Sequence, residues 1–264
     1  MMTQTGKLLV RKEAGVGVVT FNNPERLNAV SLEMWEAAKR ALDAFAADND
    51  VRVVVLTGAG DKAFVSGADI SKFGSERSTL EGVRAYDATT AATFASIDEF
   101  PKPTVAMIRG YCVGGGLGLA SCCDLRICAD DARFAVPAAK LGLGYGYAGL
   151  KRLVDIVGPS FAKEIFYTAR QFDAREAHAM GLVNRVVPVA ELESAVKAVT
   201  DMICANAPLT IKAVKFTVSE ILKDESKRDV ARVNEMVEAC FKSRDYTEGR
   251  TAFMEKRKPM FTGS

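Results

Sequence analysis

The chain has 264 residues, of which 48% are hydrophobic and 26% are charged, a balance typical of a globular protein with a sizeable core. Lysine and arginine (35) nearly balance aspartate and glutamate (33), so the sequence gives no sign of the basic surface that nucleic-acid binding requires. No apolar run reaches the roughly 18 residues of a membrane span, and the start lacks the apolar stretch of a secretory signal. We therefore expect a cytoplasmic protein with neither a nucleic-acid nor a membrane partner.

The cysteines and the histidine exclude two further classes. Six cysteines, two of them adjacent, with no C-x-x-C pair, are typical of buried free thiols in a reducing compartment. His178 is the only histidine, so we expect no metal site of the usual Cys/His kind. A Ser-His-Asp or Cys-His catalytic arrangement would have to use His178, which we expect to be an ordinary helix residue.

The predicted elements alternate between strands and helices through the first two thirds of the chain. Apolar and β-branched runs predict strands over 8–11, 16–21, 51–57, 104–108 and 125–129. Ala14-Gly15 between the first two predicts a hairpin. Helices are expected between them, over 32–47, 79–99 and 114–121. From Gly149 onward the pattern predicts only helices, over 150–157, 161–169, 174–180, 192–206, 209–222, 229–242 and 247–256. This order indicates an α/β fold with appended helices, not two independent domains.

Three glycine-bearing segments follow predicted strands or open predicted helices. Residues 144–149 spell GxGxxG, but no good strand precedes them, so a dinucleotide site is not expected. Residues 64–70 and the triplet Gly114-Gly115-Gly116 each follow a buried strand, and the triplet also opens a helix, whose free N–H groups attract anionic oxygens. Each loop alone is compatible with a packing role. Together they suggest two backbone N–H groups that converge on one oxygen.

Four motifs, in chain order, resemble the enoyl-CoA hydratase/isomerase (crotonase) family. They are FNNPERLNAVS at 21–31, AFVSGADI at 63–70, GYCVGGGLGLASCCDLRICAD at 110–130 and EGRTAFMEKRKPMF at 248–261. The resemblance implies a crotonase-like α/β spiral of ββα turns, with an acyl-CoA-binding core over 1–200 and a C-terminal helical trimerisation region over 201–264. It also implies a homotrimer or a dimer of trimers that acts on acyl-CoA thioesters and stabilises an enolate.

The resemblance also assigns roles to residues of this chain. The donors to the enolate oxygen would be the backbone N–H groups of Ala68 and Gly115, because preorganised donors are most effective where charge develops. Coenzyme A would enter as part of the substrate, with no other cofactor. Its expected contacts are Arg26, Ser66, Gly67, Asp69, Ile70, Phe253 and Lys256, where Phe253 and Lys256 reach the nucleotide of a neighbouring subunit and Asp69 mainly structures its loop. Lys62 is a further candidate cation.

The chain departs from the family pattern at both glutamates that hydratases use for proton transfer. Those positions hold Gly118 and Ala138, neither of which can transfer a proton, and losing such a group typically forfeits about 10²–10⁴-fold in rate. Ordinary two-glutamate hydration is therefore not expected. Tyr145 lies about where a decarboxylase branch of the family carries a tyrosine, although that branch has a histidine at the position of Ala68.

Several alternatives therefore stay open for the net reaction. Tyr145 is either a proton donor or a packing residue of the acyl pocket. A further acid is sought in the stretch 73–90, at Glu76, Glu81, Tyr86 or Asp87. The chain is expected to be a lyase or isomerase acting on a specialised acyl-CoA, by decarboxylation, hydrolysis or an unusual hydration or isomerisation. The named alternatives are a decarboxylase of methylmalonyl-CoA-like thioesters that uses Tyr145 and a non-catalytic acyl-CoA-binding subunit.

Overall fold

The main sheet consists of an N-terminal hairpin followed by parallel strands. The structure is a computed structural model that describes residues 6–72 and 78–264. Its six-stranded sheet has the order β1-β2-β3-β5-β7-β10, with β1 (Leu8–Glu13), β2 (Val16–Phe21), β3 (Val53–Gly58), β5 (Thr104–Ile108), β7 (Leu125–Ala129) and β10 (Arg185–Val187). Strands β1 and β2 are antiparallel and the other neighbours are parallel. The predicted hairpin and the apolar strands are confirmed.

A second, four-stranded sheet has the order β4-β6-β8-β9. Its strands are β4 (Ala63–Val65), β6 (Tyr111–Val113), β8 (Arg133–Ala135) and β9 (Phe172–Asp173). The pairs β3–β4, β5–β6 and β7–β8 each give one strand to each sheet before a helix follows, which is the spiral of ββα turns that the resemblance implies. The expected α/β class is therefore confirmed. The expectation of helices alone after Gly149 is wrong, because β9 and β10 interrupt them.

The helices lie close to their predicted ranges. They are α1 (Leu32–Ala47), α3 (Leu80–Asp98), α4 (Gly115–Cys122), α5 (Tyr147–Thr168), α6 (Ala174–Ala179), α7 (Leu192–Ala205), α8 (Pro208–Ile221), α9 (Val230–Lys242) and α10 (Arg244–Met254). The predicted helices 150–157 and 161–169 are the two arms of α5, which kinks at Gly158 before Pro159. No helix in the described ranges combines the length and the apolar character of a bilayer span.

The main sheet is buried on both faces, which explains its uninterrupted apolar strands. Successive residues of β3 point to opposite sides, so Val54 and Leu56 belong to the large core under α1, α4 and α5, while Val53 and Val55 meet α7. Helix α7 contributes Leu192 and Val196 to that second cluster. The sheet is thus a rigid base from which the connecting loops project.

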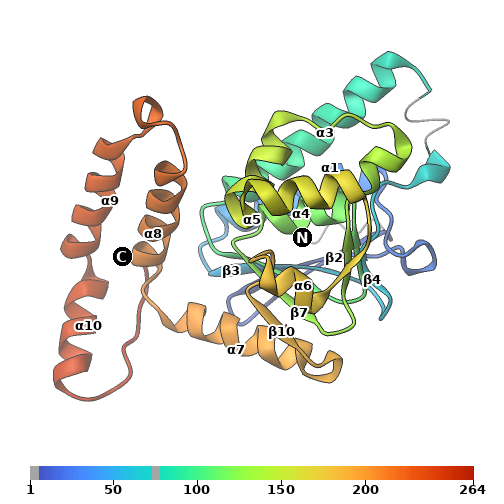
Figure 1. The fold of residues 1–264 in the computed structure, drawn as a ribbon. Coiled ribbons are helices and arrows are strands. Elements are labelled where there is room, and N and C mark those ends of the chain that lie inside the picture. Colours follow the sequence, from blue (N-terminus) through green and yellow to red (C-terminus); the bar gives the residue numbers. More distant parts are fainter. Residues whose placement is uncertain (1–5, 73–77) are drawn as a thin grey trace.

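The C-terminal helices α8, α9 and α10 stand apart from the two sheets, beyond α7 (Figure 1). The expected boundary at residue 200 falls inside α7, which packs on the main sheet. Beyond α7, many apolar side chains of α8 to α10 are exposed, among them Val214, Val218, Phe241 and Phe253. The arm formed by α8, α9 and α10 therefore exposes more apolar side chains than a surface that faces only water usually does.

Helix α4 is held against strand β4 by a close backbone contact. A Cβ atom on Gly116 would lie 2.0 Å from the carbonyl oxygen of Val65, far inside van der Waals contact. Only glycine permits this approach, which places the first turn of α4 beside the end of β4.

We predict that Gly116→Ala lowers the free energy of unfolding by about 2 kcal/mol or more, because the backbone of Val65 or of α4 must move to admit the methyl group. Gly146→Ala is the matched control, since Gly146 has a φ of −73° and open space around its Cβ position. Urea unfolding of both variants measures the difference. Equal stabilities would contradict the close contact.

Candidate active site

The loop after β4 presents one backbone N–H away from its neighbours. The amide of Val30 donates to the carbonyl of Gly67 at 2.8 Å, and the amide of Asp69 donates to the carbonyl of Val30 at 2.9 Å. Because successive residues of an extended segment direct their polar groups to alternate sides, the N–H of Ala68 points away from Val30. Within the described residues it has no hydrogen-bond acceptor.

The second loop presents a backbone N–H at the start of α4. The amide of Gly114 donates to the carbonyl of Ala135 at 2.8 Å, while that of Gly115, the first residue of the helix, has no acceptor among residues 6–72 and 78–264. A first-turn N–H is free by the geometry of the helix and carries the positive end of its dipole. It is therefore suited to an oxygen with negative charge.

The two loops are in contact. Gly67 has a φ of +114°, which favours glycine, and a Cβ atom there would lie 3.4 Å from the carbonyl oxygen of Val113 and 3.9 Å from the nitrogen of Gly115. The predicted donors Ala68 and Gly115 thus come from adjacent segments. In the part of the chain that the structure describes, neither amide has an internal acceptor.

Asp69, next to the first donor, is bound into its own loop. Its side chain, in a residue only 5% exposed, accepts hydrogen bonds from the backbone and hydroxyl of Ser71 at 3.1 and 2.7 Å and from Arg26 at 3.1 Å. Burial raises the pKa of this carboxyl, but the Ser71 hydrogen bonds and the Arg26 charge outweigh it, so the pKa lies below its usual range. Asp69 is thus held ionised by its loop, and Arg26 is paired with it.

The positions at which the resemblance expects glutamates, Gly118 and Ala138, have apolar surroundings. A Cβ atom on Gly118 would lie 3.0 Å from the ring of Phe94 and 3.5 Å from the hydroxyl of Tyr145. Ala138 is buried. No carboxylate stands at either position, and the space beside Gly118 belongs to two aromatic side chains. Sequence reasoning missed Phe94, which is 24 residues earlier in the chain and gave no local signal.

Tyr145 is half-buried and folds back over the start of α5. Its ring makes an edge-to-face contact with Phe166, with the centroids 4.7 Å apart. Its hydroxyl makes no hydrogen bond to any residue that the structure describes. Burial raises the pKa of Tyr145, so the hydroxyl is protonated at neutral pH.

An aromatic wall extends from Gly115 toward Gly118. The ring of Trp35 lies 3.7 Å from the Cβ position of Gly115 and meets Phe94 edge to face, with the centroids 5.4 Å apart. The indole N–H of Trp35 donates to the hydroxyl of Tyr86 at 3.0 Å. Tyr86 is therefore buried in this wall.

The other candidate acids of the stretch 73–90 are not part of this aromatic wall. Glu81 and Asp87 are exposed on α3, and Glu76 lies outside the described residues. His178 lies on α6 with its Nδ1 3.1 Å from the carbonyl of Val183, in keeping with an ordinary helix residue.

The expected coenzyme A contacts fall into two separate groups. Ser66 lies in the first loop, where its amide donates to the carbonyl of Leu27 at 3.1 Å, and Ile70 begins a short 3-10 turn. Lys62 is exposed just before β4. Phe253, 84% exposed, and Lys256 lie at the end of α10, which Figure 1 shows far from β4 and α4. One chain therefore does not bring the two groups together.

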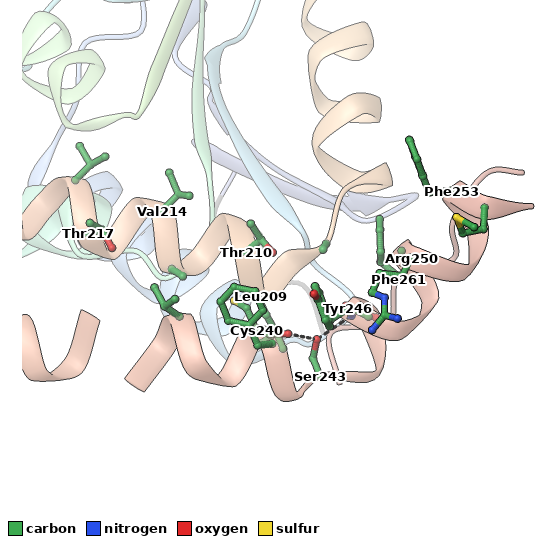
Figure 2. A pocket seen from close by; sticks show the side chains of 18 residues that line it. Leu209, Thr210, Val214, Thr217, Cys240, Ser243, Tyr246, Arg250, Phe253 and Phe261 are labelled. Atoms are coloured by element: carbon green, nitrogen blue, oxygen red, sulfur yellow. Dashed lines mark hydrogen bonds between the residues drawn. The ribbon is translucent and has the colours of Figure 1, made fainter. Parts of the chain in front are cut away.

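A large apolar cavity, which sequence reasoning missed, lies within the C-terminal arm (Figure 2). Its volume is about 920 Å³. Side chains of α8 form one side and those of α9 and α10 the other, and Phe261 also lines it. Its apolar lining includes Leu209, Val214, Val218, Val237, Phe241, Phe253 and Met254. The extra apolar positions on α8 were the available signal.

Within the described residues, no cluster of three or more His, Cys, Asp or Glu side chains suits a metal ion.

Comparisons with known proteins agree with this architecture. Residues 11–264 match the sequence model of the enoyl-CoA hydratase/isomerase family. The chain is 36% identical to a short-chain-enoyl-CoA hydratase of Clostridium acetobutylicum and covers 97% of both proteins. It is 37% identical to a crotonyl-CoA hydratase of Syntrophomonas wolfei, over 96% of this chain and 97% of that one.

Among solved structures, an enoyl-CoA hydratase/carnithine racemase from Magnetospirillum magneticum superposes with a TM-score of 0.92. The two are 36% identical, and the match covers 100% of this chain and 98% of the other. The family match, the sequence identities and the shared spiral agree over nearly the whole length. The chain therefore belongs to the enoyl-CoA hydratase/isomerase family.

Proposed function

We propose that this protein binds an acyl-CoA thioester and stabilises its enolate with the backbone N–H groups of Ala68 and Gly115. The observation that carries the proposal is that both amides lack an internal acceptor among residues 6–72 and 78–264 and come from loops in contact. A free backbone N–H is costly unless water or a ligand accepts from it. A thioester oxygen that gains charge in the reaction suits this pair, since removing one such donor typically costs about 2.7–4 kcal/mol of barrier.

The proton-transfer chemistry differs from two-glutamate hydration. The relatives above carry the name hydratase, but identity of 36–37% does not determine the residue at two particular positions, and here these are Gly118 and Ala138. Tyr145 has its hydroxyl beside Gly118, with a raised pKa. A protonated phenol can deliver a proton to the α-carbon of an enolate. We therefore assign Tyr145 as the proton donor.

Decarboxylation is the reaction that fits this set of groups best. Loss of CO₂ from a malonyl- or methylmalonyl-type thioester leaves its electron pair on the α-carbon and so generates the enolate without a base. The apolar surroundings of Gly118 and Ala138 place no carboxylate there to repel the substrate's own anion. A non-catalytic acyl-CoA binder shares the pocket and predicts binding without turnover.

Assembly completes the coenzyme A site in this proposal. Phe253 and Lys256 are remote from the first loop within one chain, and the apolar cavity of the arm formed by α8, α9 and α10 is open to a second copy. We propose a homotrimer or a dimer of trimers, in which the arm of one subunit lies near the loop of its neighbour. Burial of the exposed apolar side chains drives this association.

The first prediction concerns the substrate. Purified protein incubated with malonyl-, methylmalonyl- and crotonyl-CoA is expected to release CO₂ from a carboxylated thioester and to hydrate crotonyl-CoA at least about 10²-fold more slowly than a two-glutamate hydratase. Mass spectrometry of the products measures both reactions. Hydration at a rate usual for hydratases would contradict the assignment from Gly118 and Ala138, whereas binding of all three without turnover would favour the binder.

The second prediction concerns Tyr145. Tyr145→Phe keeps the ring contact with Phe166 but removes the proton, so we expect kcat to fall by about 10²-fold or more with little change in stability. Tyr147→Phe is the matched control, because Tyr147 is 81% exposed, and it should retain full activity. Steady-state kinetics of both variants test this, and a Tyr145→Phe enzyme with unchanged kcat would show that the ring only packs.

The third prediction concerns assembly. Val218→Asp places a charge in the apolar cavity and is expected to convert the oligomer to smaller species, while Ser219→Asp adds the same charge at an adjacent exposed position that does not line the cavity. Light scattering after size-exclusion chromatography gives the mass of each. A monomeric wild type, or an unaffected Val218→Asp variant, would contradict the assembly.

A further inference from the structure

Arg126 of β7 is a buried cation whose side chain donates hydrogen bonds to backbone carbonyls. The residue is 6% exposed, and its Nε donates to the carbonyl of Leu182 at 2.6 Å. Its Nη1 donates to the carbonyls of Cys123 and Ala120, at 2.5 and 3.5 Å. Within the described residues it forms no salt bridge. Burial lowers the pKa of Arg126, yet a guanidinium remains charged in proteins.

Two of these acceptors belong to the end of α4. Ala120 lies in its last turn and Cys123 directly follows its final residue. The C-terminal end of a helix carries a partial charge of about −0.5, opposite to the positive end at its first residue. Helix α4 has eight residues, hence about 12 Å of length, so both ends act on the N–H of Gly115. The positive charge of Arg126 offsets the unfavourable effect of the negative C-terminal end of α4.

Two ion pairs of the described residues lie near this end of α4. Asp98, whose pKa is raised by burial against the effect of Arg152, accepts a hydrogen bond from the Nε of Arg152 at 2.9 Å. Asp124 accepts hydrogen bonds from the amide of Thr104 at 2.7 Å and from Lys215 at 2.8 Å. Each pair has no net charge, so Arg126 supplies the net positive charge at the C-terminal end of the helix.

We propose that Arg126 is a positioning residue of the active site, which acts through α4 and favours negative charge on the oxygen bound at Gly115. The inference rests on the proposed role of Ala68 and Gly115 and adds to it a source of field outside the substrate pocket. At about 12 Å and an intermediate effective dielectric constant, one charge changes the stability of the bound enolate about tenfold.

The test uses the intact protein with acetoacetyl-CoA, whose enolate has its own ultraviolet absorbance. The readout is the pH at which the bound ligand ionises, which a merely structural role of Arg126 does not move. Arg126→Gln keeps hydrogen-bond donors for the helix carbonyls but loses the charge, so its bound ligand should ionise about one pH unit higher, equivalent to tenfold. Arg126→Lys keeps the charge and should restore ionisation to near the wild-type pH.

Asp124→Asn is a second, independent variant, for which the expected shift in the ionisation pH of the bound ligand has the opposite sign. It removes a negative charge at the same end of α4 and leaves Lys215 unpaired, so the bound ligand should ionise at a lower pH than in the wild type. The Asp124→Asn measurement tests the effect of charge at this end of α4 even when Arg126→Gln does not fold. A thioether analogue of acyl-CoA, which cannot ionise, should bind equally to every folded variant.

The outcomes separate the two proposals. Ionisation at the wild-type pH in Arg126→Gln, or an unchanged or raised value in Asp124→Asn, overturns the role of Arg126 and leaves the donors Ala68 and Gly115 intact. A wild-type protein that binds acetoacetyl-CoA without lowering its ionisation pH relative to free ligand overturns the proposed donors themselves. Opposite shifts in the two variants support the inference.

Discussion

The candidate site depends on two backbone N–H groups, those of Ala68 and Gly115, which have no internal acceptor among the residues that the structure describes. A backbone N–H becomes free where the chain leaves a regular ladder or begins a helix, and Ala68 and Gly115 are one example of each. The contact between the two loops requires Gly67 to take a positive φ and Gly116 to press against Val65. The buried sheet beneath both loops keeps this arrangement rigid.

The elements that the sequence predicts well are those long enough to show a period. The hairpin 8–21, helix α1 and the apolar strands β5 and β7 follow from alternation or from continuous burial. The second sheet does not follow in this way, since its strands have two or three residues, too few to display any period. Only the resemblance to a family implied those strands, through the expected ββα turns.

The candidate site also has parts that the sequence predicts and parts that it does not. The two donor loops were predictable because glycine triplets and small residues after buried strands have a direct physical meaning. Phe94 and Tyr145 meet beside Gly118 from distant parts of the chain, and no local pattern encodes such a meeting. The extra apolar positions on α8 were a signal, but they did not predict the cavity between α8, α9 and α10, because an apolar stripe looks the same whether it covers its own core or another subunit.

A crystal structure with a bound, unreactive acyl-CoA analogue tests the central claim most directly. The account predicts the thioester oxygen within hydrogen-bond distance, about 2.7–3.1 Å, of both the Ala68 and the Gly115 nitrogens, with the hydroxyl of Tyr145 facing the α-carbon. A thioester oxygen bound elsewhere, or one that meets only a single amide while the other accepts a water or a side chain in its place, would contradict it.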